Sequence, residues 1–217
     1  MTNKTRVAVL VSGFGSNLQA FIDGAQNSSL PIDIVGVISN VEGAFSLDRA
    51  RNAGIPNQCI PHGQFPDREI FDQALLTQLD KWQPELVVLA GFMRILSSNF
   101  VDRFKNRLIN IHPSLLPDYT GLNTHQRVID AGEQWHGSSV HFVIPELDAG
   151  PVIVQGKLQV HNDDTAETLQ QRIHIIEHQI YPLAIQWFAE DRLNVTKKGD
   201  VLLNNLKNTD QLITFNI

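Results

Sequence analysis

The chain has 217 residues, 42% of them hydrophobic and 18% charged, which supplies enough apolar surface for a sizeable core. Its formal net charge is -6, which argues against a nucleic-acid partner, since nucleic-acid phosphates attract basic surfaces. A single cysteine, a polar start over 1–6 and the lack of a run of about 20 apolar residues predict a cytoplasmic protein with no disulfide framework and no membrane partner.

Strands and helices alternate in the first half of the sequence. Residues 7–11 are apolar and lead into a glycine-containing turn, after which Leu18, Phe21 and Ile22 recur at helical spacing. Similar patterns predict strands over 32–39, 57–60, 86–90 and 108–111, and helices over 44–53 and 67–81. This alternation predicts an α/β fold with a mostly parallel, doubly wound sheet.

The pattern changes after residue 112. A loop rich in Pro, Gly and Thr over 113–125 and a short helix over 126–132 precede two apolar segments, 140–144 and 152–160. A turn at 148–151 joins these segments into an antiparallel hairpin. A long amphipathic helix follows over 165–189, with Pro182 inside it. No repeat or linker is evident, so a single domain over 1–217 is expected, with a tail over 191–217 that carries no recognisable site.

The segment Gly13-Phe14-Gly15-Ser16-Asn17 joins the first strand to the first helix. Backbone N–H groups at a helix start, together with the positive end of the helix dipole, bind anions. A dinucleotide fits less well, because Leu18 occupies the place of a third glycine and the second strand ends without an acid for the ribose. The loop therefore predicts a mononucleotide or phosphate site, with a tight turn that binds nothing as the alternative.

Asn110 and His112 stand at the end of a central strand. Strand alternation puts them on one face, about 7 Å apart, and open α/β sheets bind ligands at the carboxyl ends of their strands. An amide beside an imidazole can stabilise an oxyanion and transfer a proton, so the pair is a catalytic candidate. Asp148 lies in the hairpin turn, where Asp-x-Gly is common, and its own pattern favours a structural role.

The segment His174-Ile175-Ile176-Glu177-His178 matches an inverted zinc-peptidase pattern, with both imidazoles on one helical face. Glu190 is the only glutamate after it, so the pattern lacks a suitable partner. No G-x-S-x-G segment supports a serine hydrolase either. We therefore expect no metal and interpret these histidines as polar positions at the helix edge.

Three blocks of sequence occur in order: SGFGSNLQA over 12–20, LAGFMRILS over 89–97, and NIHPSLLP over 110–117, the last followed by His136-Gly137 and LDAGP over 147–151. Together they resemble the phosphoribosylglycinamide formyltransferase family from residue 6 to about residue 190. The middle blocks are shared with the wider superfamily of folate-dependent formyltransferases. The first block, with Glu177-His178 and Tyr181-Pro182-Leu183, is closer to this family.

The resemblance implies a Rossmann-like formyltransferase domain acting on small molecules. Its reaction transfers formyl from the co-substrate 10-formyltetrahydrofolate to the glycine amine of phosphoribosylglycinamide in de novo purine biosynthesis, without a metal. The products are phosphoribosyl-N-formylglycinamide and tetrahydrofolate. The resemblance also implies a ribonucleotide-binding half at about 1–105, a folate and catalytic half at about 106–190, and a monomer or homodimer without nucleic-acid or membrane partners.

Site residues follow from the same resemblance. It implies a catalytic set of Asn110, His112 and Asp148. Residues implied to bind the ribonucleotide are Gly15, Ser16, Asn17, Glu177 and His174, although relatives often carry Gln or Lys in place of this histidine. Residues implied to bind the folate are Arg68, Met93, Arg94, Ile95, Leu96, Asn110, Val143 and Leu147.

The catalytic set has a coherent chemistry. When the substrate amine attacks the formyl carbon, Asn110 and a protonated His112 can donate hydrogen bonds to the oxyanion. A nearby Asp148 carboxylate would favour the protonated imidazole, and water ordered by either group could return a proton to the folate nitrogen. The alternative is a formyltetrahydrofolate hydrolase, a family with an additional N-terminal regulatory domain, whereas the first strand here begins close to Met1.

Overall fold

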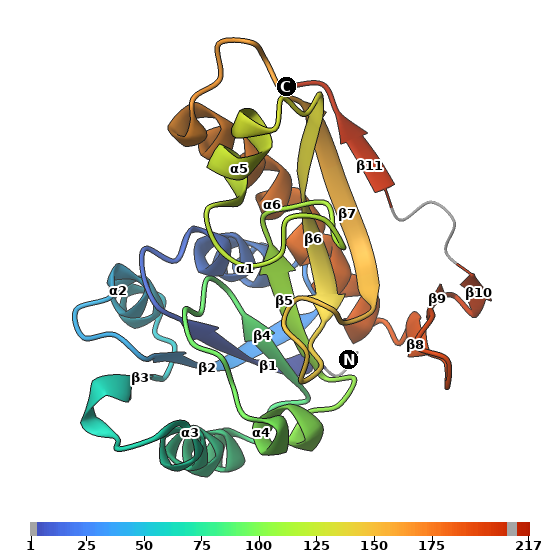
Figure 1. The fold of residues 1–217 in the computed structure, drawn as a ribbon. Helices are drawn as coiled ribbons and strands as arrows, with labels where there is room; N and C mark the ends of the chain where they lie inside the picture. The colour runs from blue at the N-terminus through green and yellow to red at the C-terminus, as the bar shows by residue number, and fades with distance from the viewer. Residues whose placement is uncertain (1–3, 208–211) are drawn as a thin grey trace. The chain divides into compact units, whose positions relative to one another are not determined.

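The computed structural model describes residues 4–207 and 212–217, and its architecture is the expected α/β one (Figure 1). A mostly parallel sheet is combined with an antiparallel extension and a long C-terminal helix. The expectations for the polar start and for the tail include residues 1–3 and 208–211, which lie outside the described residues. Two compact units make up the chain, residues 1–110 and 111–217.

The first unit contains a parallel sheet in the strand order β3-β2-β1-β4-β5. Its strands are β1 (Thr5–Val11), β2 (Ile32–Ser39), β3 (Asn57–Cys59), β4 (Leu86–Leu89) and the start of β5 (Leu108–His112). Its helices are α1 (Ser16–Gln26), α2 (Phe45–Asn52), α3 (Arg68–Trp82), α4 (Ser98–Arg103) and the single 3-10 turn η1 (His62–Gln64). Figure 1 shows α1 and α2 on one face of this sheet and α3 and α4 on the other, which confirms the doubly wound prediction.

The strands at the centre of this sheet are apolar because helices cover both of its faces. Every residue of β4 is buried, as are the last five residues of β1. Close packing also demands glycine in β2, since a Cβ on Gly36 would lie 2.3 Å from the Trp82 ring. Apolar runs of this kind are what a strand buried on both sides requires, and they made these strands predictable.

The second unit is built on the antiparallel pair β6 (Trp135–Phe142) and β7 (Val152–Gln159). Strand β11 (Leu212–Phe215) adds in parallel beside β7. Helix α5 (Thr124–Asp130) precedes the pair, and the long helix α6 (Ala166–Ala189) packs against both strands. A Cβ on Gly156 of β7 would lie 2.2 Å from Ile176 Cγ2, so glycine lets α6 approach the strand closely.

Several predictions need correction. The first hairpin strand, expected over 140–144, begins at Trp135, because His136, Ser138 and Ser139 are buried yet polar and interrupt the apolar pattern. The tail also contains β8 (Leu193–Val195), β9 (Val201–Leu203) and β10 (Leu206–Lys207), which pair in a small antiparallel sheet of their own.

Among the described residues, no helix is long and apolar enough to cross a membrane.

Candidate functional site

The glycine loop joins β1 to α1 in the first unit, as predicted. Gly15 is the N-cap of α1 and has a φ of 75°, in the left-handed region that favours glycine. A Cβ at this position would also lie only 2.6 Å from Ser46 Cβ, so both the backbone and the available space require glycine. Ser16 and Asn17 begin the helix, at the positive end of its dipole, where an anion is stabilised.

Ser12 connects this loop to two further strand ends of the first unit. Its hydroxyl accepts a hydrogen bond from Met93 N at 2.7 Å and donates one to Asn40 Oδ1 at 2.6 Å. Asn40 follows β2, and Met93 lies in the segment after β4. The carboxyl ends of β1, β2 and β4 are therefore tied together, at the edge where open α/β sheets bind ligands.

The segment after β4, residues 91–97, alternates exposed and buried side chains. Met93 and Ile95 are 68% and 56% exposed, while Leu96 is buried. Large apolar side chains held in solvent in this way offer a surface for an apolar ring. The guanidinium of Arg94 instead lies against the Phe71 ring, 5.4 Å from its centre.

Asp72 of α3 fixes the end of the same segment. This carboxylate is buried and accepts a hydrogen bond from Ser97 N at 2.6 Å. Burial raises the pKa of Asp72, although the hydrogen bonds from Ser97 and the charges of Arg68 and Arg94 oppose that shift. Arg68, the predicted anion-binding residue, is half-exposed at the start of α3 and lies 3.8 Å from Glu69.

His112 and Asp148 come together in the second unit, although 35 residues separate them in the sequence. The distance from His112 Nδ1 to Asp148 Oδ2 is 3.5 Å, and both side chains are buried. His112 Nε2 lies 2.9 Å from the Tyr119 carbonyl oxygen, and Asp148 Oδ2 also accepts a hydrogen bond from Gly121 N at 2.9 Å. Both ring nitrogens thus face oxygens that accept hydrogen bonds.

Asp148 therefore does more than form a turn. It lies in the segment between β6 and β7 and has a φ of 53°. This is the left-handed region, which Asp tolerates better than most residues. Val143 and Leu147, the predicted folate residues of this segment, are half-buried and 57% exposed respectively. Asn110 lies two residues before His112 on β5 and is the last residue of the first unit.

Glu177 on α6 is a buried carboxylate, 5% exposed. Its Oε1 lies 3.1 Å from Ser138 Oγ, and the same hydroxyl lies 2.9 Å from the His112 carbonyl oxygen. Ser138 on β6 thus connects Glu177, a predicted ribonucleotide residue, to His112, the predicted catalytic histidine, within the second unit. The sequence offered no signal for Ser138, since an isolated serine in a strand looks like a surface position.

A family model for formyl transferases matches residues 5–185 of the chain. The chain belongs to the formyl transferase family. This formyl transferase is 48% identical, over 189 residues, to the phosphoribosylglycinamide formyltransferase of Escherichia coli (strain K12), a match that covers 87% of this chain and 89% of that protein.

Two further comparisons agree with that family. The trifunctional purine biosynthetic protein adenosine-3 of Bos taurus is 45% identical over 198 residues, which are 91% of this formyl transferase but only 20% of the longer protein. The solved structure of phosphoribosylglycinamide formyltransferase from Coxiella burnetii, in complex with CHES, superposes with a TM-score of 0.91 at 48% identity. It covers 98% of this chain and 100% of that one. The predicted family and fold are thereby confirmed.

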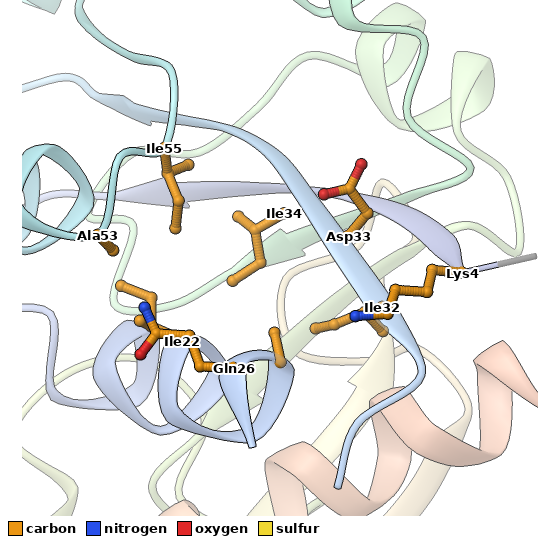
Figure 2. A pocket seen from close by; sticks show the side chains of 9 residues that line it. Lys4, Ile22, Gln26, Ile32, Asp33, Ile34, Ala53 and Ile55 are labelled. Carbon is orange, nitrogen blue, oxygen red and sulfur yellow. The ribbon is translucent and has the colours of Figure 1, made fainter. Parts of the chain in front are cut away.

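The formyl transferase also has a pocket elsewhere in its first unit (Figure 2). Its walls come from the start of β2, the second half of α1, the residue just before β1 and the residues that follow α2. None of the predicted site residues lines it; the lining residues are Lys4, Ile22, Ala25, Gln26, Ile32, Asp33, Ile34, Ala53 and Ile55. Because these positions lie away from the carboxyl ends of the strands, the pocket is not the candidate site.

Two buried histidines, His125 on α5 and His136 on β6, contact each other through Nδ1 and Nε2 at 2.9 Å. Burial lowers the pKa of His125 to about 4 and that of His136 to about 3, and neighbouring imidazoles lower both further. Burial and the charge of His174 likewise lower the pKa of His178, and the rings of these two α6 residues stack 6.4 Å apart. Within the described part of the chain, no three metal-ligating side chains are grouped to hold an ion.

The histidine pair predicts a loss of stability in mild acid. As the pH falls below about 6.5, the unfolded chain protonates both imidazoles, while the folded pair stays neutral until about pH 4. The free energy of unfolding should therefore decrease between these values and stay level above about pH 7. Urea unfolding at pH 7.5 and pH 5 measures this change. His125→Gln should reduce the decrease and the exposed His161→Gln should not; equal decreases in all three proteins would contradict the prediction.

Proposed function

We propose that the chain is a phosphoribosylglycinamide formyltransferase, which transfers formyl from 10-formyltetrahydrofolate to the glycine amine of phosphoribosylglycinamide. The observation that carries this proposal is the 48% identity, over nearly the whole chain, to the Escherichia coli protein of that name. The contact of His112 with Asp148 supports it, because it places an imidazole that can donate hydrogen bonds beside a carboxylate. The protein acts on small molecules as a monomer or homodimer.

The chemistry begins when the neutral glycine amine attacks the formyl carbon bound to the folate nitrogen. The formyl oxygen becomes an oxyanion, which Asn110 and the His112 Nε2–H group stabilise by donating hydrogen bonds. Asp148 compensates the positive charge of the imidazolium. The amine then loses a proton, the bond to the folate nitrogen breaks, and that nitrogen gains a proton relayed by water held at Asp148 or His112.

The binding assignments follow the two units. Gly15, Ser16 and Asn17 bind the ribonucleotide phosphate at the start of α1, supported by the left-handed Gly15 and the helix dipole. Glu177 and His174 of α6 contact the rest of the ribonucleotide, where a buried carboxylate can accept hydrogen bonds from hydroxyl groups.

The folate is assigned to apolar and basic positions. The exposed Met93 and Ile95, with Arg94 and Leu96, provide backbone and apolar contacts, and the half-exposed Arg68 guanidinium pairs with an anionic group of the folate. Val143 and Leu147 contact its ring from the segment between β6 and β7.

The reaction is tested by following the release of deformylated folate spectroscopically, with and without phosphoribosylglycinamide. We expect release only when the ribonucleotide is present. Release at the same rate in its absence would instead identify a hydrolase, and the ribonucleotide assignments would be wrong.

Substitutions in the glycine loop should affect one substrate selectively. Ser16→Ala and Asn17→Ala are each expected to raise the KM for the ribonucleotide by roughly tenfold, the loss of about one charge-assisted hydrogen bond. Steady-state kinetics with each substrate varied in turn measures this effect. Asn27→Ala at the other end of α1 is the matched control. An equal increase in the folate KM would contradict the assignment.

A further inference from the structure

We infer that Arg49 of α2 is a positioning residue for the phosphate-binding loop over 13–17, an inference that rests on the proposed function. Its side chain reaches back from α2 to that loop and makes two hydrogen bonds. Arg49 Nε donates to the Phe14 carbonyl oxygen at 2.9 Å, and Nη1 donates to Gln19 Oε1 at 2.9 Å. One guanidinium thereby connects the loop itself to the first turn of α1.

A second residue of α2 supports the same loop one peptide earlier. Ser46 N donates to the Gly13 carbonyl oxygen at 3.1 Å. The carbonyl groups of Gly13 and Phe14 are therefore both held by α2. In a trans peptide the C=O and the following N–H point in opposite directions. The N–H groups of Phe14 and Gly15 are consequently turned away from α2, as a loop that presents donors to an anion requires.

The hydrogen bond from Arg49 also acts on the donor strength of the loop. A cation that donates to a peptide oxygen polarises that peptide, and polarised hydrogen bonds in a chain strengthen one another. The peptide whose oxygen Arg49 holds carries the Gly15 N–H group at the start of α1. Arg49 therefore both fixes the direction of this donor and makes it a better one.

Two exposed aromatic rings hold the guanidinium in place. Arg49 Cζ lies 4.4 Å from the centre of the Phe14 ring and 4.8 Å from that of Phe45. The two rings stack 5.2 Å apart at an interplanar angle of 15°, although they are 65% and 47% exposed. Contact between a guanidinium and ring faces is stabilising, which explains why large apolar side chains stand in solvent at this place.

The test compares three variants in steady-state kinetics. Arg49→Ala should raise the KM for the ribonucleotide by roughly tenfold, equivalent to about 1.4 kcal/mol, with kcat at saturation and the folate KM unchanged. Arg51→Ala is the matched control, because Arg51 lies on the same helix, carries the same charge and pairs with Asp48 instead of the loop. It should leave the ribonucleotide KM unchanged.

Gln19→Ala separates positioning from direct binding of phosphate by Arg49. This variant keeps the charge of Arg49 but removes one of its two anchors. We expect a rise of about threefold in the ribonucleotide KM, smaller than for Arg49→Ala because only one of the two hydrogen bonds of Arg49 is lost. An unchanged or lower KM for Gln19→Ala would overturn the inference, because a guanidinium that binds phosphate directly does not need to be held by Gln19.

A measurement without turnover keeps this inference distinct from the proposed function. Inorganic phosphate titrated into ¹⁵N-labelled wild-type protein should shift the Gly15 amide resonance, and Arg49→Ala should weaken that response while Arg51→Ala preserves it. Equal responses in both variants would overturn the role of Arg49. Failure of the wild type to require the ribonucleotide in the formyl-transfer assay would instead overturn the proposed function and the ribonucleotide assignments, while the phosphate titration would still test Arg49. Thermal unfolding of each variant verifies that it is folded.

Discussion

Replacing His112 with alanine is expected to lower kcat by roughly a thousandfold, the size of effect seen when an oxyanion donor that also transfers a proton is removed. The imidazole contacts both Asp148 and the Tyr119 carbonyl oxygen, and alanine removes both contacts together with the proposed donor. Single-turnover measurement of folate release gives the rate of the chemical step directly.

Binding controls show whether that loss concerns chemistry. Folate binding to His112→Ala, followed by fluorescence titration, should stay within a few-fold of the wild type, because the substitution removes a group that acts on the oxyanion. His161→Ala, an exposed histidine of the second unit, should leave kcat unchanged. Turnover of His112→Ala close to that of the wild type would remove this residue from the mechanism.

Asp148→Asn is the second substitution with a large expected effect, a decrease in kcat of roughly a hundredfold. The amide has the shape of the carboxylate and can still accept the hydrogen bond from Gly121 N, so the segment between β6 and β7 should keep its conformation. What disappears is the negative charge 3.5 Å from His112 Nδ1, which compensates positive charge on the ring in the proposed reaction.

The charge and the turn can be separated experimentally. Asp148→Ala removes both the charge and the acceptor for Gly121 N, so it should lower the free energy of unfolding as well as kcat, whereas Asp148→Asn should lower kcat alone. Asp163→Asn, at an exposed position, controls for the change in net charge. If Asp148→Asn kept wild-type kcat, Asp148 would be a turn residue, as its own sequence pattern suggested.

The parallel sheet could be predicted because the composition of its strands is distinctive. β1 and β4 are buried on both faces and are therefore continuous apolar runs, and glycine or proline marks most of their ends. The start of β6 could not be predicted in this way, since His136, Ser138 and Ser139 are buried by virtue of hydrogen bonds and contacts with residues far away in the sequence. Polar side chains that a fold buries and satisfies carry no local signal.

The candidate site likewise has one part that a local sequence pattern predicts and one part that depends on contacts between distant residues. Strand alternation predicts that Asn110 and His112 share a face, because both lie on one short strand. The contact between His112 and Asp148 depends on how the hairpin β6–β7 returns beside the end of β5 in the second unit, and no local spacing encodes it. Only the family resemblance predicted Asp148 as a site residue. Tyr119 was not predicted, because its backbone carbonyl and not its side chain contacts His112.

Cys59 illustrates a smaller limit. Its exposure cannot be seen from the sequence, and the structure places the side chain, partly exposed, on the edge strand β3. Burial and the nearby Glu42 carboxylate still raise the pKa of the thiol, so Cys59 is kept in its less reactive protonated form.

The carbonyl of Tyr119 is an internal competitor for the proton that His112 holds at Nε2. In the proposed reaction the formyl oxygen takes the place of this carbonyl, and a neutral formyl oxygen, an acceptor of about the same strength, gains little by doing so. An oxyanion forms a charge-assisted hydrogen bond roughly twice as strong, and it wins that exchange. Because of the contact with Tyr119, His112 would stabilise the bound substrate little and the tetrahedral intermediate more. Stabilisation that is larger near the transition state than in the ground state is what accelerates a reaction.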